Sequence, residues 1–172
     1  MRTYYLSGKT ILAMAQLRNL LLLVLLTAGP LACNRNPAAN DLASLRKTTQ
    51  SIRDAFARGD VPAIVALHHP DVIKYFGGNN VVVGRAAIEK SLRELFQTSK
   101  MEFIENKVES TVFCGETAIE TSIFGINVIP KSGGKPSFFR GRSMVIYIRY
   151  KESPTGWASI REMTQAAPDQ NN

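Results

Sequence analysis

The sequence predicts one α+β domain in which three helices and a short hairpin precede a strongly curved antiparallel sheet of four long strands. Helical spacing of apolar residues is confined to residues 42–97, whereas strand-like stretches fill residues 101–164. The links between the last four strands are only two to seven residues long, which makes neighbouring strands antiparallel. A bent sheet wrapped on one side by helices leaves a cavity at its open end.

The helices have recognisable start and stop signals. Apolar residues at helical spacing predict a first helix over Leu42–Arg58, which Gly59 ends. Asp60 can cap a second helix, and we expect Pro70 to stop it. A third helix is predicted over Ala86–Gln97.

Two short strands and four long ones account for the rest of the domain. A tight Gly-Gly-Asn-Asn turn joins the short strands Val72–Phe76 and Val81–Val83. The long strands are predicted at Met101–Cys114, Thr117–Ile129, Ser137–Tyr150 and Trp157–Thr164. We expect the domain to span residues 41–165 and the tail 166–172 to be disordered.

Residues 1–32 are typical of a secretory signal peptide. Arg18 precedes the apolar run Leu20–Leu26, which is too short to cross a bilayer. A basic start, a short apolar stretch and small residues before a cleavage site describe an export signal. The sequence leaves open whether translation starts at Met1 or at Met14.

The end of this leader, Pro30-Leu-Ala-Cys33, resembles a bacterial lipobox. The resemblance implies cleavage after Ala32, a diacylglycerol anchor on Cys33, and a linker over residues 33–40. Asn34 resembles the residue that sorts lipoproteins to an outer membrane. We therefore expect an exported protein, anchored by lipid on the periplasmic side of the cell envelope. The alternative is ordinary cleavage nearby, which leaves Cys33 as a free thiol or a disulfide partner.

Composition excludes several classes of function. Three of the 21 basic residues lie in the leader, so 18 basic residues face 14 acidic ones in the remainder. This balance is too mild for a nucleic-acid binder. The chain has no nucleophile elbow, phosphate-binding glycine loop or dinucleotide fingerprint, and we expect no cofactor. Cys114 is predicted to be a buried, unreactive thiol.

Four stretches resemble the SnoaL-like and ketosteroid-isomerase-like branch of the nuclear-transport-factor-2-like superfamily. They are Ile52–Asp60, Ala66–Asp71, Gly84–Glu89 and Gly156–Glu162. The resemblance spans the whole domain and implies a cone-shaped barrel that can dimerise through the outer face of its sheet. This fold serves isomerases, cyclases, dehydratases, hydrolases and binding modules, so the resemblance specifies no reaction.

The isomerase chemistry of that branch does not carry over to this chain. Aligned on the shared Gly59-Asp60, the hydroxyl donor falls at Ile52, the carboxylate base at Phe76, and the second acid near residues 143–145. None of these residues can form the base or the oxyanion hole that the reaction needs. We therefore do not expect steroid-isomerase activity.

Ten residues are candidates for the cavity: His68, His69, Asp71, Tyr75, Phe76, Phe103, Ser143, Tyr147, Trp157 and Arg161. Either histidine could act as a base with Asp71, or could simply lie at a helix C-terminus, which favours cations. Adjacent histidines diverge, so we expect no metal site. Arg161 is one of several arginines that could recognise a carboxylate ligand or serve solubility.

Three functions remain open at this point, and no catalytic residue is assigned. The first is a module that binds a small apolar or amphipathic molecule. The second is a cyclase, isomerase or dehydratase that uses a histidine or Asp71 with Tyr75. The third is a structural lipoprotein whose sheet contacts a second copy or a partner. Phe138 and Phe139, beside basic residues, could touch lipid headgroups or pack inward.

Overall fold

The computed structural model describes residues 39–168. The predicted signal peptide, the cleavage site at Ala32, the lipidated Cys33 and most of the linker lie outside the described residues. The first described helix begins at Ala39, three residues before the predicted start at Leu42. At the other end the last strand reaches Ala166.

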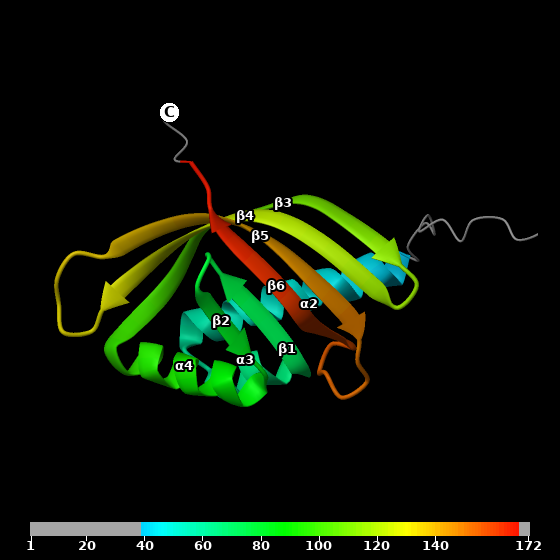
Figure 1. Cartoon of the computed structure of the whole chain (residues 1–172), viewed down its shortest axis with the longest axis horizontal. Helices are drawn as coiled ribbons and strands as arrows, with labels where there is room; N and C mark the ends of the chain where they lie inside the picture. Colours follow the sequence, from blue (N-terminus) through cyan, green and yellow to red (C-terminus); the bar gives the residue numbers. More distant parts are fainter. Residues whose placement is uncertain (1–38, 169–172) are drawn as a thin grey trace, which may run out of the picture. The chain divides into compact units, whose positions relative to one another are not determined.

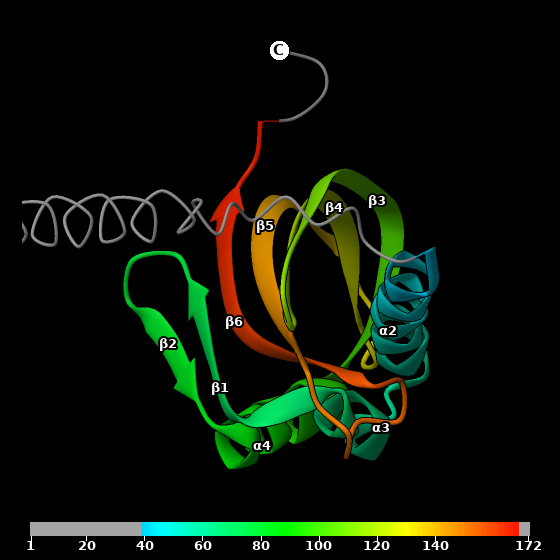
Figure 2. The same cartoon turned by 90° about the vertical axis from the view of Figure 1, so that its right-hand side faces the viewer.

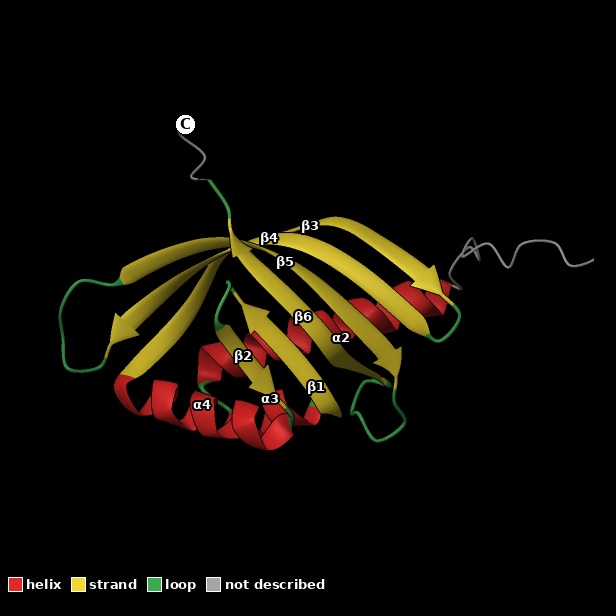
Figure 3. Ribbon diagram, in the orientation of Figure 1, coloured by secondary structure: helices red, strands yellow, loops and turns green. Residues whose placement is uncertain are grey.

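Helices and long strands are segregated along the chain, which confirms the predicted fold class (Figures 1 and 3). The elements in order are α2 (Ala39–Arg58), α3 (Val61–Ala66), β1 (His68–Phe76), β2 (Asn80–Val83), α4 (Arg85–Thr98), β3 (Ser99–Cys114), β4 (Thr117–Pro130), β5 (Ser137–Arg149) and β6 (Trp157–Ala166).

The strands form one six-stranded sheet in the order β2-β1-β6-β5-β4-β3. Strands β3 to β6 make an antiparallel meander, and β1 pairs with β6 in parallel. Figure 2 shows the sheet curled around an interior, with α2 beside β3 and with α3 and α4 across the lower end. All described helices therefore lie against the concave side of the sheet, as the cone-shaped fold requires.

The second helix ends earlier than predicted. Helix α3 stops at Ala66, and His68 already pairs with Ser159 of β6. The Ser159 N–H donates to the carbonyl of Leu67 at 3.1 Å. Pro70 lies where the β1–β6 register shifts, and a residue without an N–H is tolerated at such an irregularity. His68 directly follows Leu67, the C-cap of α3, as one of the two expectations for the histidines had it, but both histidines belong to strand β1.

Two apolar clusters hold the layers together. One joins the start of α2 to the sheet: Leu45, Phe113, Ala118, Val145, Tyr147 and Trp157. The other lies between the three helices and β1: Ala55, Val61, Ile64, Val72, Ile88 and Leu92. Asp60 caps α3 as predicted, because its Oδ1 accepts the Ala63 N–H at 3.1 Å.

The prediction of a buried free thiol at Cys114 is wrong. Cys114 is half-buried at the end of β3 and is disulfide-bonded, so no described cysteine is free. The sequence contains one other cysteine, Cys33, which lies outside the described residues.

Two features of the described domain bear on membrane contact. Over residues 39–168, no helix has the length and apolar character needed to cross a bilayer. The β4–β5 hairpin and the start of α2 lie at opposite ends of the domain (Figure 1). The tip that carries Phe138 and Phe139 is therefore remote from the point where the chain enters the domain.

Candidate functional site

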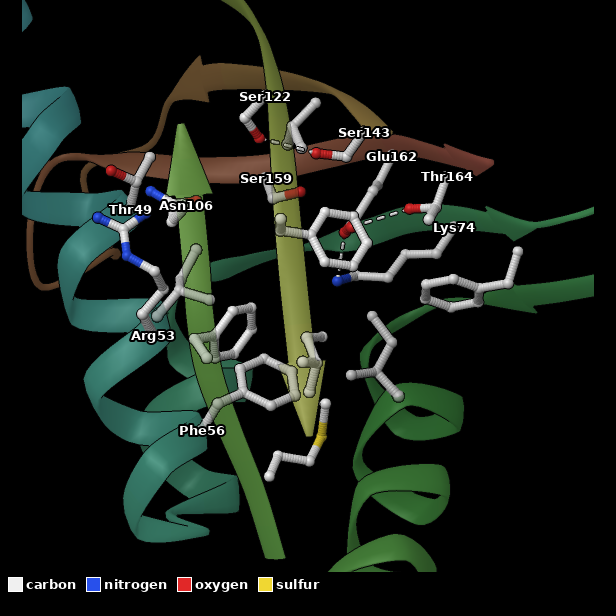
Figure 4. Close-up of a pocket in the computed structure, with 18 of the residues that line it drawn as sticks. Thr49, Arg53, Phe56, Lys74, Asn106, Ser122, Ser143, Ser159, Glu162 and Thr164 are labelled. Atoms are coloured by element: carbon white, nitrogen blue, oxygen red, sulfur yellow. Dashed lines mark hydrogen bonds and ion pairs between the residues drawn. The ribbon is translucent and has the colours of Figure 1, made fainter. Parts of the chain in front are cut away.

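A cavity of about 390 Å³ lies between the concave face of the sheet and helices α2 and α4 (Figure 4). This volume falls in the range of small-molecule sites, which are mostly apolar with a few placed polar groups. The cavity arises because the curved sheet and the helices diverge instead of packing along their whole length.

One wall of the cavity is apolar. Its side chains come mainly from the two helices and from the part of the meander near the β4–β5 hairpin: Ile52, Phe56, Ile88, Leu92, Leu95, Met101, Phe103, Phe124, Ile126 and Phe139. Phe56 and Phe103 meet edge to face, with ring centroids 5.9 Å apart. Such a wall suits an aromatic or aliphatic ligand body.

The opposite wall carries a mostly polar row of register partners that crosses four strands and continues to Thr111 on a fifth. The register aligns Lys74, Glu162, Val145, Glu120 and Thr111 on β1, β6, β5, β4 and β3. The Lys74 ammonium lies 2.6 Å from Glu162 Oε2, and the two side chains are only 10% and 18% exposed. The Thr111 hydroxyl donates to Glu120 at 3.4 Å. We call this set the charged row.

A second row, of hydroxyl groups, lies next to the charged row. It aligns Thr164, Ser143 and Ser122 on β6, β5 and β4. The Ser122 and Ser143 oxygens are 3.0 Å apart, and Thr164 donates to Glu162 Oε1 at 3.4 Å. The two rows make a polar floor beneath the apolar helices.

A β-bulge brings both Ser159 and Glu162 onto this floor. Tyr147 pairs with Ser159 and Ile146 with Arg161, so Ile160 has no partner on β5. In a regular strand, residues three apart point to opposite faces. The extra residue at the bulge restores Glu162 to the cavity side and turns Arg161 outward.

Burial dominates the electrostatics of the floor. Burial raises the pKa of Glu120, partly opposed by the positive charge of Arg53 and by the hydrogen bond from Thr111. Burial, with the negative charges of Glu120 and Glu162, raises the pKa of Tyr147 well above its usual value, so its phenol stays protonated. Ser159 Oγ is buried and has no hydrogen-bond partner among the described residues.

Four of the ten predicted candidates line the cavity: Phe76, Phe103, Ser143 and Tyr147. The residues that occupy the isomerase positions, Ile52, Phe76, Ser143 and Val145, also line it. The positions that the resemblance aligns with the isomerase residues thus lie around one cavity, where this chain carries apolar or neutral groups.

The two histidines lie elsewhere. His68 is buried, and its Nδ1 lies 2.7 Å from the carbonyl oxygen of Ile64. Burial, reinforced by the charge of Lys74, lowers the pKa of His68 well below its usual value, so the ring is neutral. His69 packs against Tyr150, with ring centroids 4.9 Å apart. Neither ring lines the cavity.

The other four candidates also lie away from the cavity. Asp71 is exposed, and Tyr75 faces the opposite side of β1 from Lys74 and Phe76. Arg161 donates to the carbonyl of Asp71 at 2.9 Å.

Trp157 belongs to the core instead. Its Nε1 donates to Ser44 at 2.9 Å, and the Arg149 guanidinium lies 4.0 Å from the ring centroid.

Sequence reasoning missed the ionisable residues of the cavity: Arg53, Lys74, Glu120 and Glu162. Strand alternation could have found Lys74, because it shares a face with Phe76, which was predicted. No comparable signal marked Glu162, whose direction depends on the bulge. Within residues 39–168, no three or more His, Cys, Asp or Glu side chains cluster as a metal would require.

Comparisons with known proteins agree with this architecture. The family model of the SnoaL-like domain matches residues 49–151. A conserved protein from Planctomyces limnophilus DSM 3776 is 20% identical, with a TM-score of 0.68 over 76% of this chain and 100% of that one. A ketosteroid isomerase-like protein from Erwinia carotovora atroseptica SCRI1043 is 17% identical, with a TM-score of 0.65 over 77% and 100%.

A nuclear transport factor 2-like superfamily protein from Salmonella enterica serovar Typhimurium LT2 is 12% identical, with a TM-score of 0.62 over 75% of this chain and 92% of that one. At these identities the similarity to solved structures establishes the fold and nothing about activity. A search of the curated proteins found no match.

Proposed function

This chain belongs to the SnoaL-like domain family, and from that premise we propose that its domain binds a small molecule with an apolar body. The observation that carries the proposal is the cavity of about 390 Å³, with an apolar wall facing a polar floor. A buried Lys–Glu pair contributes little to folding, and an unpartnered buried hydroxyl is a cost. Polar groups that line a cavity are typical of a site that orients a ligand.

A cavity-filling variant tests ligand binding. Val145 lies in the middle of the charged row, so Val145→Phe should fill the space above it. Val112→Phe makes the same change at an exposed position on β3 and serves as the control. We expect the neutral fluorescent probe N-phenyl-1-naphthylamine to bind saturably to the wild type and to the control, and at least about tenfold more weakly to Val145→Phe. Absence of saturable binding, or equal binding by both variants, would contradict the proposal.

We also propose that the protein is exported. The leader supports export, and so does a disulfide at Cys114, because disulfides persist in oxidising compartments. A lipid anchor would use the sulfur of Cys33, so it excludes a disulfide between the two cysteines of the chain. A lipid anchor on Cys33 and a disulfide between the two cysteines are therefore mutually exclusive.

An anchor at Cys33 would orient the domain. The six peptide steps from Cys33 to Ala39 reach about 20 Å at full extension. The start of α2 would then lie close to the bilayer. The hairpin that carries Phe138 and Phe139 would point away from it, since it occupies the opposite end of the domain (Figure 1).

An enzymatic role is a second candidate, favoured by two carboxylates on the cavity floor. Glu120 and Glu162 flank Val145 in the charged row, and their environments differ, because only Glu162 has an ammonium partner. Two carboxyl groups in different environments can share general acid and base roles. Recovery of a bound compound in altered form, abolished by Glu120→Gln or Glu162→Gln, would support catalysis; unchanged recovery would support binding alone.

Contact with a second copy is the third candidate. Met144 and Met163 are register partners on the outer face of the sheet, 49% and 61% exposed. Apolar side chains gathered on an exposed face mark interaction sites. Sedimentation equilibrium of the wild type and of Met144→Glu tests this role: a dimer that the charge dissociates supports it, and a monomeric wild type contradicts it.

A further inference from the structure

The polar floor also indicates which ligand chemistry the cavity accepts, an inference that rests on the proposed function. We propose that the ligand is an amphipathic monoanion, with an apolar body and a single carboxylate-type head that binds to Lys74 and Ser159. The argument has three parts: unused hydrogen-bond donors, the charge of the lining, and the layout of the two walls.

Two side chains of the floor have hydrogen-bond donors without a protein partner. Lys74 carries three N–H groups, of which one reaches Glu162 at 2.6 Å. Ser159 is 1% exposed, and its hydroxyl has no partner among the described residues. A ligand head that accepts hydrogen bonds would satisfy these donors.

The carboxyl groups of the floor already accept hydrogen bonds from neighbouring side chains. Glu162 accepts from Lys74 through Oε2 and from Thr164 through Oε1. Glu120 accepts from Thr111, and the Ser122 and Ser143 hydroxyls bond to each other. A cationic head at this end of the cavity would also lie beside the Lys74 ammonium, whereas an anionic head would pair with it.

The charges of the cavity lining also favour an anionic ligand. Two cations, Arg53 and Lys74, and two carboxyl groups, Glu120 and Glu162, line the cavity. Burial raises the pKa of Glu120, which favours its neutral form. Because burial disfavours the charged form of Glu120, the two cations are the stronger charges of the lining, and a ligand head with a single negative charge complements them.

The layout of the walls sets the orientation of the ligand. Lys74, Glu162 and Ser159 lie at one end of the cavity, whereas Phe56 lies at the other (Figure 4). A ligand with its head at Lys74 extends its body across the cavity toward Phe56, Met101 and Phe103, where apolar burial stabilises it. The cavity is thus polar at one end and apolar at the other, which matches an amphipathic ligand.

Three probes that share a ten-carbon chain test the head group: decanoate, decanol and decylammonium. Titration calorimetry at pH 7, below the micellar concentrations, should show decanoate binding at least about tenfold more tightly than the other two. The double variant Lys74→Gln/Glu162→Gln removes both charges and keeps a polar side chain at each position. We expect it to lower the affinity for decanoate to that for decanol, and the exposed control Lys151→Gln to leave it unchanged.

Ser159→Ala gives a second, smaller change if the double variant does not fold. It should weaken decanoate binding by about fivefold, the effect of one lost hydrogen bond. Unchanged decanoate affinity in this variant would overturn the proposal.

The remaining outcomes separate the two proposals. Decanol or decylammonium binding as tightly as decanoate, with all binding lost in Val145→Phe, would overturn the anionic head and leave the ligand-binding function standing. No binding of any probe, or binding that Val145→Phe does not affect, would overturn both.

Discussion

Lys74 and Glu162 form an ion pair on the concave face of the sheet, under a layer of apolar helix residues. Removing two charges from water costs free energy that their mutual attraction largely offsets, so such a pair adds little net stability. Loss of one partner alone leaves a buried charge without compensation. The main effect of the pair is to hold the Lys74 ammonium at the cavity surface.

This reasoning predicts an asymmetric mutational cycle. Lys74→Met should lower the free energy of unfolding by about 1–3 kcal/mol, a range reduced because the pair borders a cavity. Lys74→Met/Glu162→Leu should recover most of that loss. Urea unfolding measures both, with the exposed Lys90→Met as a control that changes stability by less than about 0.5 kcal/mol. A double variant no more stable than the single one would contradict this account of the pair.

The buried carboxyl group of Glu120 is expected to make the free energy of unfolding depend on pH. Burial raises its pKa in the folded state, so the folded protein keeps a proton that the unfolded chain loses above a pH of about 4.3. The resulting loss of folding stability is absent below that pH, increases as the pH rises, and reaches its full size above the raised pKa. Arg46 and Arg53 of α2 oppose this shift, and Tyr147 of β5 faces the same carboxyl group.

Glu120→Gln removes that cost. We expect the variant to gain stability relative to the wild type as the pH rises from 4 to 8, measured by urea unfolding at each pH. A difference between the two proteins that does not change with pH would show that the carboxyl group titrates normally.

At the scale of elements, the sequence allowed the helices, the hairpin and the four long strands to be predicted, because their periodicity and turn residues are local signals. The sequence predicts that the second helix continues to Pro70, because proline is the local stop signal. The start of β1 at His68 could not be predicted, since it depends on pairing with β6. The bulge at Ile160 could not be predicted from the sequence either, because it is defined only by the register against β5. That single irregularity decides that Glu162, and not Arg161, faces the cavity.

A close approach between strands predicts the effect of one glycine substitution. A Cβ at Gly141 of β5 would lie 2.6 Å from Cζ of Phe124 and 2.9 Å from Cε1 of Phe139. Both rings line the cavity, so Gly141→Ala should displace that wall, lower stability by about 1–3 kcal/mol and weaken probe binding.

Gly78→Ala, whose Cβ meets nothing within 4 Å, is the matched control and should be close to neutral in thermal unfolding. Equal behaviour of the two variants would mean that the Phe124 and Phe139 rings move freely.

At the scale of the whole molecule, the fold places helices and sheet on two sides of a cavity and the chain entry at one end. The fold follows from the order of elements, which the sequence displays. The chemistry of the cavity does not, because the charged row joins residues from five strands that only the register brings together.

The chemical state of Cys33 and Cys114 distinguishes an exported protein with a lipid anchor from an exported protein with a disulfide. Intact mass spectrometry of the mature protein, with thiol alkylation before and after reduction, should show cleavage of the leader. Diacylglycerol on Cys33 supports the lipid anchor. An unmodified Cys33, with both thiols protected until reduction, supports the disulfide and contradicts the anchor. A chain that retains residues 1–32, with both thiols free, would contradict export itself.

Methionine methyl NMR tests most directly whether the cavity is the binding site. Met101 lines the cavity, whereas Met144 and Met163 are exposed on the outer face of the sheet and act as internal controls. In protein labelled with ¹³C at the methionine methyl groups, decanoate should shift the Met101 signal saturably and leave Met144 and Met163 unchanged. Shifts confined to the two outer methionines, or no shift at all, would contradict a ligand site between the helices and the sheet.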